Sequence, residues 1–398
     1  MRPAQCRRVP RARGRVPRLR RPAVLLKKED ERDLTLRGYV AFLDPPKDTA
    51  RAAIAALRTG GVAVKVLTGD NELVSRKICR EVGIATDAVL VGGQVEGMSD
   101  AELAAAADKT TLFARLSPAH KRRVIRCLQG AGHVVGFLGD GINDAPALRA
   151  AAVGVSVDTA TDIAKESADV ILLEKDLLVL EEGVRQGRKV FANILKYVRM
   201  GASSNFGNMF SVLGASAFLP FVPMLPIQIL ANNLLYDLSQ VAIPTDDVDP
   251  EQVAEPRPWS IAQITRYILF IGPCSSVFDY VTFFVMLYVF GCWAPANASV
   301  FQTAWFVESL LTQTLVIHVI RTNRIPFFQS RASRPLIATT GAVMLVGASL
   351  PFSPVGPLLG FAPLPVLYWP ILALILFGYV LLTQVVKMWL VRKCGVTG

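Results

Sequence analysis

Two aspartates, Asp140 and Asp144, lie four residues apart in the glycine-containing segment 134–148, VVGFLGDGINDAPAL. The apolar residues before Asp140 predict a buried strand, and a predicted helix begins at Ala145. Both carboxylates would then lie at the carboxyl end of a strand, where open α/β sheets bind ligands. Neighbouring carboxylates repel unless a cation or a proton lies between them. Mg²⁺, held by one or two carboxylates and a phosphate, suits this pattern.

Two other interpretations of this loop remain. The first is a solvated turn rich in aspartate and asparagine, because short motifs often occur by chance. The second is a dinucleotide-binding loop, which Gly139 and Gly141 suggest. The two acids argue against the second interpretation, since they would face the negative charge of a pyrophosphate.

The composition indicates a protein with a membrane part. The chain has 398 residues, 52% of them hydrophobic, and a mean hydropathy of +0.39. It is therefore long enough for two or more domains and too apolar to be wholly soluble. The net charge is +11, but residues 1–21 contain nine arginines and no acid. This segment lacks aromatic residues and the apolar core of a signal peptide, so we expect residues 1–28 to be a disordered tail and nucleic acid not to be a partner.

Cysteine and histidine give no sign of a metal or disulfide framework. The six cysteines form no CxxC pair, and the three histidines are isolated in the sequence. Neither zinc ligation nor a set of disulfides is indicated by these spacings.

Strands and helices alternate from residue 38 to about residue 180. Besides the run before Asp140, the predicted strands are 38–43, 62–67, 111–114, 152–157 and 169–173, and the predicted helices include 47–58, 72–82 and 119–129. This alternation predicts a parallel sheet covered by helices on both faces. We therefore expect residues 29–180 to form a doubly wound α/β domain.

Six apolar stretches follow, at residues 198–219, 224–244, 264–290, 301–320, 335–350 and 366–390. Each is close to the roughly 20 residues that a helix needs to cross a bilayer. We expect residues 181–398 to form an all-α bundle of six transmembrane helices in contact with lipid. Lysines and arginines gather before the first stretch, between the fourth and fifth, and after the last. The positive-inside rule and the even number of spans both place the two termini in the cytoplasm.

Several polar side chains lie inside the predicted spans, where burying them is costly. The first span contains Asn205 and Asn208, and the second contains Asn233 and Asp237. Spacings of three and four residues put each pair on one helix face. Asp237 is therefore a candidate transport residue, and interhelical hydrogen bonding is an alternative role for the asparagines. For Glu308, which we place near the entrance of the fourth span, a snorkelling or structural role explains the residue at least as well as coordination.

Four motifs, in this order, resemble those of the P-type ATPases. They are Asp44-Pro45-Pro46, Thr68-Gly69-Asp70-Asn71, Phe113-Ala114-Arg115 with Pro118 and Lys121, and Gly139-Asp140-Gly141-Ile142-Asn143-Asp144-Ala145-Pro146. Segments 203–208 (SSNFGN), 232–237 (NNLLYD) and 305–322 (WFVESLLTQTLVIHVIRT) resemble the bacterial magnesium-importing subgroup. The resemblance runs from about residue 29 to the end. It implies an incomplete phosphorylation domain of the haloacid-dehalogenase-like fold, followed by the membrane helices.

The resemblance also implies a role for each matching residue. Asp140 would hold the catalytic Mg²⁺, with Asp144 supporting that site. Asn143 and Thr68 would hydrogen-bond the phosphoryl oxygens, and Lys121 would neutralise charge on the transferring group. Gly69 and Asp70 would support catalysis, and Asp44, Pro45 and Pro46 would form a hinge to a nucleotide domain. A transported divalent cation would lie near Asn208, Asn233 and Asp237, with Asn205 and Tyr236 adjacent.

The implied function is cation transport driven by ATP, most simply Mg²⁺ import across the bacterial inner membrane. The family phosphorylates an aspartate in a DKTGT motif, which this sequence lacks. The run 108–111 (DKTT) precedes its strand instead of following it, so we interpret it as the end of a helix. We also expect the nucleotide domain, the actuator domain and the first four membrane helices to be absent. The chain alone would then neither hydrolyse ATP nor transport, because the covalent intermediate has no nucleophile.

Two rival classes remain. One is a membrane-anchored phosphatase of the same superfamily, which would need its own nucleophilic aspartate. The other is a non-enzymatic membrane partner, or the remnant of a broken pump, that complements a missing amino-terminal half encoded separately.

Overall fold

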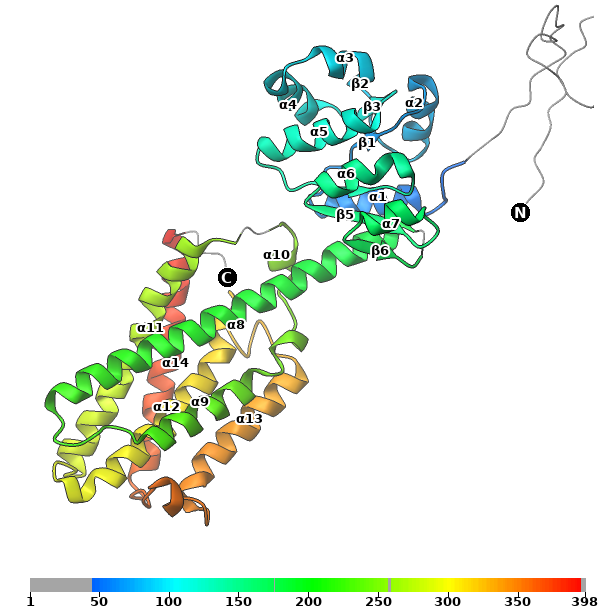
Figure 1. Cartoon of the computed structure of the whole chain (residues 1–398). Helices are drawn as coiled ribbons and strands as arrows, with labels where there is room; N and C mark the ends of the chain where they lie inside the picture. The colour runs from blue at the N-terminus through cyan, green and yellow to red at the C-terminus, as the bar shows by residue number, and fades with distance from the viewer. Residues whose placement is uncertain (1–44, 175, 257–258, 395–398) are drawn as a thin grey trace, which may run out of the picture. The chain divides into compact units, whose positions relative to one another are not determined.

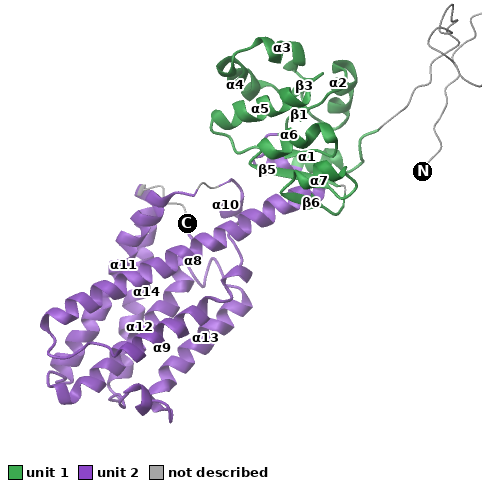
Figure 2. Ribbon diagram, in the orientation of Figure 1, with its two compact units in different colours: residues 1–55, 64–176 green, residues 56–63, 177–398 purple. Residues whose placement is uncertain are grey.

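The computed structural model describes residues 45–394 except 175, 257 and 258. It contains two compact units, which are coloured separately in Figure 2. Among the described residues, the first unit comprises 45–55 and 64–176 and is an α/β unit, and the second comprises 56–63 and 177–394 and is helical. The predicted tail, the predicted strand at 38–43 and the hinge residue Asp44 lie outside the described residues.

The described part of the α/β unit contains two three-stranded sheets in which every pairing is parallel. One has the order β1 (Val66–Leu67), β3 (Leu112–Ala114), β2 (Val89–Val91), and the other has the order β4 (Gly136–Leu138), β5 (Val153–Val157), β6 (Val170–Leu172). Parallel pairing is what the alternation of strands and helices predicted. The single expected sheet is divided, because β1 pairs only with β3 and β4 only with β5 among these strands.

Figure 1 labels the seven helices of this unit, three of which begin at a side-chain cap. They are α1 (Ala50–Thr59), α2 (Glu72–Glu81), α3 (Gly92–Gly97), α4 (Asp100–Lys109), α5 (Pro118–Gly130), α6 (Ala145–Ala150) and α7 (Asp162–Glu166), with α1 continuing into the second unit. Asn71 caps α2, Ser99 caps α4 and Ser117 caps α5, each accepting a hydrogen bond from a backbone amide of the first turn. The run 108–111 begins in the last two residues of α4, so the helix-end interpretation is confirmed.

Helix α5 is held between two hydrophobic cores. Val124 is buried in the core that contains Leu103 and Phe113, and the next residue, Ile125, is buried in the core that contains Phe137. Neighbouring residues of one helix thus pack into both cores. This fixes the position of the first turn of α5, which carries Lys121.

The helical unit is a bundle built around α12. Its helices are α8 (Leu177–Phe218), α9 (Pro226–Gln240), α10 (Pro250–Val253), α11 (Ile261–Phe284) with a π-helical turn (Val285–Val289), α12 (Ala298–Ile320), α13 (Arg334–Ser349) and α14 (Tyr368–Cys394). Helix α8 is a single helix of 42 residues, in keeping with a sequence that shows no turn signal between its charged and apolar parts. Helix α12 contacts α8, α9, α11, α13 and α14 and is almost completely buried. The apolar surfaces of α13 and α14 are mostly exposed, as expected for helices that face lipid.

By length and composition, four helical segments of the described residues are able to cross a membrane. They are Ile261–Val289, Pro295–Ile320, Arg334–Phe352 and Tyr368–Lys393. The first two predicted spans correspond to α8 and α9. Helix α9 has 15 residues, fewer than the roughly 20 that a perpendicular crossing needs, and the apolar half of α8 contains asparagines. The predicted count of six is therefore not reached by this measure.

Candidate functional site

The loop after β1 is fixed by hydrogen bonds to the segment that follows β3. Thr68 Oγ1 donates to Asp70 Oδ2 at 3.0 Å and accepts from the amide of Asp70 at 3.1 Å. The amides of Leu116 and Arg115 donate to the carbonyls of Thr68 and Asp70, each at 3.0 Å. Arg115 makes this contact with φ at 54°, a conformation uncommon for a residue other than glycine. Thr68, Gly69 and Asp70 are thereby held at the carboxyl end of β1.

Lys121 and Asp144 meet across 23 residues of sequence. Lys121 Nζ donates to Asp144 Oδ1 at 2.7 Å, and each side chain is only 13% exposed. The amide of Gly141 donates to Asp144 Oδ2 at 3.2 Å. A Cβ atom at Gly139 would lie 2.6 Å from the Cβ of Asp144, so a side chain there would displace the carboxylate. Both oxygens of Asp144 are therefore held in place.

Asp140 lies in the same loop, two residues after β4, and is exposed. The loop is anchored on both sides of this residue: Ser156 Oγ donates to the carbonyl of Gly139 at 2.8 Å, and the amide of Thr161 donates to the carbonyl of Asp140 at 3.1 Å. Asn143 is also exposed, in the 3₁₀ turn Ile142–Asp144. The structure thus presents a carboxylate, a carboxamide and the Lys121–Asp144 pair around one loop.

This set of groups fits Mg²⁺ bound together with a phosphate. Among the described residues no group of three or more His, Cys, Asp or Glu side chains has the geometry to hold a metal ion. Mg²⁺ is commonly bound by one or two carboxylates and completes its shell with water and phosphate oxygens. Asp140 is the exposed carboxylate of the loop, whereas the Asp144 side chain is only 13% exposed and lies against Lys121. Asp140 is therefore the ligand that the geometry favours.

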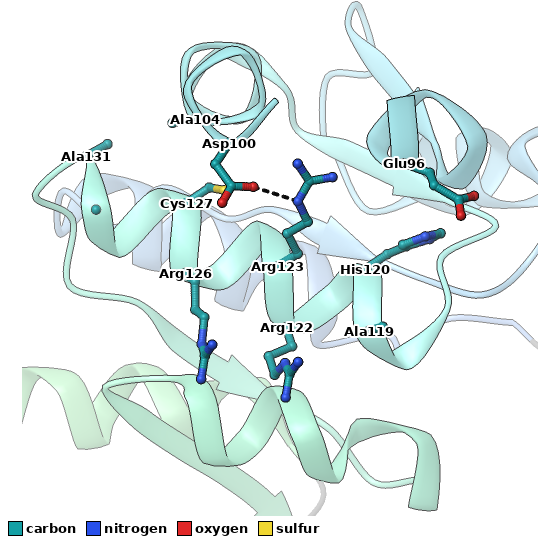
Figure 3. A pocket seen from close by; sticks show the side chains of 11 residues that line it. Glu96, Asp100, Ala104, Ala119, His120, Arg122, Arg123, Arg126, Cys127 and Ala131 are labelled. Atoms are coloured by element: carbon teal, nitrogen blue, oxygen red, sulfur yellow. Dashed lines mark hydrogen bonds and ion pairs between the residues drawn. The ribbon is translucent and has the colours of Figure 1, made fainter. Parts of the chain in front are cut away.

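A separate hollow of about 660 Å³ lies along α4 and α5 and is lined by arginines of α5 (Figure 3). Arg123 forms an ion pair with Asp100 at 2.7 Å and also donates to the carbonyls of Val95 and Met98. It therefore ties the end of α3 and the start of α4 to α5. None of the described residues that we predicted to handle phosphate lines this hollow.

In the helical unit, four of the five residues predicted to lie near the transported ion line one hollow of about 420 Å³. Asn205 comes from α8, and Asn233, Tyr236 and Asp237 come from α9. Asp237 also lines an adjoining hollow of about 400 Å³. Asn208 does not line either hollow. Its Oδ1 accepts a hydrogen bond of 3.5 Å from Ser309 of α12.

Two buried acids change the sequence-based description of the bundle. Glu308 lies near the middle of α12 with no exposed surface, so placing it near a span entrance, where it would snorkel, was wrong. Asp279 of α11 is 1% exposed and was missed. It accepts hydrogen bonds from Ser211 Oγ at 2.6 Å and from Trp305 Nε1 at 2.8 Å. The signal was present in the sequence, since Asp279 is a carboxylate within the third apolar stretch, just as Asp237 is in the second.

A further carboxylate, Asp246, follows α9 and is completely buried. Its Oδ2 accepts from Lys196 Nζ at 2.9 Å and from Arg321 Nε at 2.8 Å, and its Oδ1 accepts from the amide of Ser333 at 3.1 Å. Burial by itself raises the pKa of Asp246, but the hydrogen bonds and positive charges of Arg321 and Lys196 outweigh burial and hold this pKa below its ordinary value.

Two family models match this chain. The family model described as haloacid dehalogenase-like hydrolase matches residues 9–152, and the model described as the C-terminus of cation transporting ATPases matches residues 221–389. The chain is 58% identical over 366 residues to a protein named "Magnesium-transporting ATPase, P-type 1" in Salmonella typhimurium, and equally so to the protein of that name in Escherichia coli. The chain is a relative of the P-type ATPases. The resemblance drawn from the motifs is thereby confirmed.

The P-type resemblance extends over 92% of this chain but over only 41% of each magnesium-transporting relative. The chain thus spans about two fifths of the length of these curated relatives, and it corresponds to their carboxyl-terminal part. A more distant relative, an endoplasmic reticulum calcium ATPase of Aspergillus fumigatus, is 34% identical over 64% of this chain and 28% of its own length. The α/β unit is therefore haloacid-dehalogenase-like, and the apolar helices and bacterial relatives indicate a bacterial membrane protein.

Proposed function

We propose that this chain forms the carboxyl-terminal part of a P-type pump that imports Mg²⁺ across the bacterial inner membrane. The observation that carries the proposal is the ion pair between Lys121 of α5 and Asp144, 2.7 Å apart. Asp144 lies in the loop that also presents Asp140. The names of the most similar relatives support Mg²⁺ as the transported ion, and the hollow that Asp237 lines supports cation passage in the helical unit.

Four residues around the loop have a role in this proposal. Asp140 would hold the catalytic Mg²⁺, which supplies positive charge against a phosphoryl group. Lys121 would add a second positive charge, and its contact with Asp144 keeps the ammonium group in position. Thr68 and Asn143 would donate hydrogen bonds to phosphoryl oxygens. Phosphoryl transfer depends mainly on such positioning and charge stabilisation.

The phosphorylated aspartate would come from a segment outside these 398 residues, whose sequence contains no DKTGT motif. The divided sheet supports this idea. Strands β1 and β4 each end a sheet, and each therefore has one edge without a neighbour among the described strands. Open strand edges readily accept another strand. Leu67, next to one of these edges, packs against the cores of both sheets, so an added strand would meet an apolar surface already formed.

Functional complementation tests this proposal. The chain is co-expressed with the amino-terminal part of a magnesium-transporting P-type ATPase, up to and including its nucleotide domain, in bacteria that lack their own Mg²⁺ uptake. We expect growth at low Mg²⁺ and uptake of Mg²⁺ only when both parts are present. Lys121→Ala and Asp140→Asn are expected to lower uptake by about 100-fold or more, because each removes charge stabilisation of the transferring group.

The matched control is Arg122→Ala, which removes a neighbouring positive charge of α5 that lies outside the loop and is expected to leave uptake unchanged. Equal uptake by the Asp140→Asn variant would contradict the assigned site. Mg²⁺-dependent hydrolysis of small phosphoesters by the chain alone would instead favour a membrane-anchored phosphatase.

A further inference from the structure

Asp279 lies at the meeting point of three helices. Its two oxygens accept hydrogen bonds from two different neighbours, Ser211 Oγ of α8 at 2.6 Å and Trp305 Nε1 of α12 at 2.8 Å. Both partners are donors, and a carboxylate satisfied by donors on each oxygen is best suited to carry the negative charge. Among the described residues, no lysine, arginine or histidine forms an ion pair with this group, which is 1% exposed. Asp279 is thus a buried acid whose charge is stabilised only by neutral donors.

Glu308 lies one helical turn after Trp305, so it is on the same side of α12 and faces Asp279. Trp305 Nε1 donates to Asp279 Oδ1, so this side of α12 is the side that meets Asp279. Glu308 has no exposed surface, and neither of its oxygens accepts a hydrogen bond from a described protein donor. An ionised carboxylate in this position would be buried beside a second carboxylate without a donor or a cation, which is energetically unfavourable. A proton on Glu308 removes that cost and supplies a donor that points toward Asp279.

We propose that Asp279 and Glu308 together form a proton-binding site, in which Glu308 carries the proton and hydrogen-bonds the Asp279 carboxylate. The pair then has a single negative charge, as expected for two acids that share one buried position. The hydroxyls of Tyr280, the next residue of α11, and Tyr368 of α14 donate to the backbone carbonyls of Phe210 and Ala304, so these donors are already used. The site is independent of the proposed transport function, because its evidence lies wholly in the contacts within the helical unit.

The donors around Asp279 favour a proton over a metal ion. Mg²⁺ and Ca²⁺ require six or more oxygen ligands, whereas the Asp279 oxygens already accept an N–H and an O–H. The described residues supply no third carboxylate, cysteine or histidine to this position. A proton needs only one donor and one acceptor, which this pair provides.

Infrared difference spectroscopy tests the assignment. The purified full chain is placed in lipid nanodiscs at neutral pH with a chelator of divalent cations, and the carbonyl stretch of a protonated carboxylic acid is recorded in H₂O and D₂O. We expect one such band in the parent chain and complete loss of it in Glu308→Gln. We expect Asp279→Asn to keep the band at a displaced frequency, because an amide is a weaker acceptor than a carboxylate.

Glu166→Gln, the same change at an exposed position of the α/β unit, is the matched control and is expected to leave the band unchanged. Circular dichroism establishes that each variant is folded, and Asp279→Asn keeps the test decisive should Glu308→Gln not fold. The absence of an acid band from the parent chain would overturn the proposal. So would loss of the band in Asp279→Asn with retention in Glu308→Gln, or loss of the band when Mg²⁺ is added.

Discussion

At the scale of single residues, the Asp246 carboxylate connects three parts of the helical unit. It joins Lys196 of α8, Arg321 at the end of α12 and the backbone just before α13. Removing one partner from a buried ion pair leaves the other charges uncompensated. We therefore expect Asp246→Asn to lower the free energy of unfolding by about 3–5 kcal/mol, measured by thermal or denaturant unfolding in detergent.

The lowered pKa of Asp246 also predicts how this stabilisation depends on pH. A group whose folded-state pKa lies below its unfolded value of about 3.9 contributes stability at higher pH and loses it as the pH falls through the folded-state pKa. The parent chain should lose stability in this acidic range, and Asp246→Asn should show less of that loss.

Asp247→Asn is the matched control for Asp246→Asn. The Asp247 side chain is 77% exposed, and its ion pair with Lys189 is long, at 3.9 Å. An effect of this control as large as that of Asp246→Asn would contradict the role we assign to the buried network. A pH profile unchanged by Asp246→Asn would contradict the sign of the pKa shift.

The residues that the sequence identified and those that it missed differ in how their partners are arranged along the chain. Short motifs contain Asp140, Asp144, Thr68 and Lys121, and such motifs are recognisable in the sequence without knowledge of the fold. Asp246 owes its role to partners 50 and 75 residues away, which no local pattern connects to it. The same limit applies to contacts that Asp279 makes with α8 and α12.

At the scale of elements, α8 and α11 approach each other through small residues. A Cβ atom at Gly207 would lie 2.0 Å from Ser275 Oγ and 2.7 Å from the carbonyl of Gly272. Ser276 Oγ donates to the carbonyl of Gly207 at 2.9 Å. Small residues at such crossings allow backbones to come close, and interhelical hydrogen bonds then form. We expect Gly207→Ala to destabilise the helical unit by about 1–3 kcal/mol, measured as a lower midpoint of unfolding.

Gly183→Ala provides the control within the same helix. No atom lies within 4 Å of a Cβ built at Gly183, so alanine has room there and improves helix propensity by about 1 kcal/mol. Stabilisation by Gly183→Ala together with destabilisation by Gly207→Ala would isolate the effect of the close approach. No loss of stability in Gly207→Ala would mean that the two helices separate at little cost.

Helices were easier to predict than strands at this scale. The long apolar stretches and the alternation of strands, polar loops and helices gave helix positions within a few residues. The strands have two to five residues each, too few for a clear periodic pattern, and β2 was not predicted at all. The division into two sheets depends on which strands pair, and strand pairing is a property of the tertiary fold.

At the scale of the whole helical unit, the links between helices separate by charge. Gln302 Nε2 donates to the carbonyl of Val222 at 2.7 Å, and Gln228 Nε2 donates to the carbonyl of Leu359 at 3.0 Å, so the links after α8 and α13 and the start of α12 lie together. These links have no charged residues from 219 to 225 or from 350 to 367. Asp246 and Arg321 lie at links near the other ends of the helices, and Lys387 of α14 reaches the same end, where its Nζ donates to the carbonyl of Thr322 at 2.9 Å. The bundle therefore has one charged end and one uncharged end, the arrangement that the positive-inside rule requires of a membrane protein.

This separation leads to a test of topology that includes α8 and α9. If all six long helices cross the bilayer with the charged end in the cytoplasm, Ser353→Cys lies outside and Glu251→Cys lies inside. In a version of the chain without its native cysteines, a maleimide reagent that cannot cross membranes should label Ser353→Cys in intact cells. Glu251→Cys should react only after the membrane is permeabilised.

Phe221→Cys distinguishes six crossings from four, because the link between α8 and α9 reaches the outer surface only if both helices span the membrane. Labelling of Phe221→Cys in intact cells is the expected result. Protection of that position, with Ser353→Cys still labelled, would mean that the short α9 and the asparagine-containing half of α8 do not cross, despite their contacts with the buried α12.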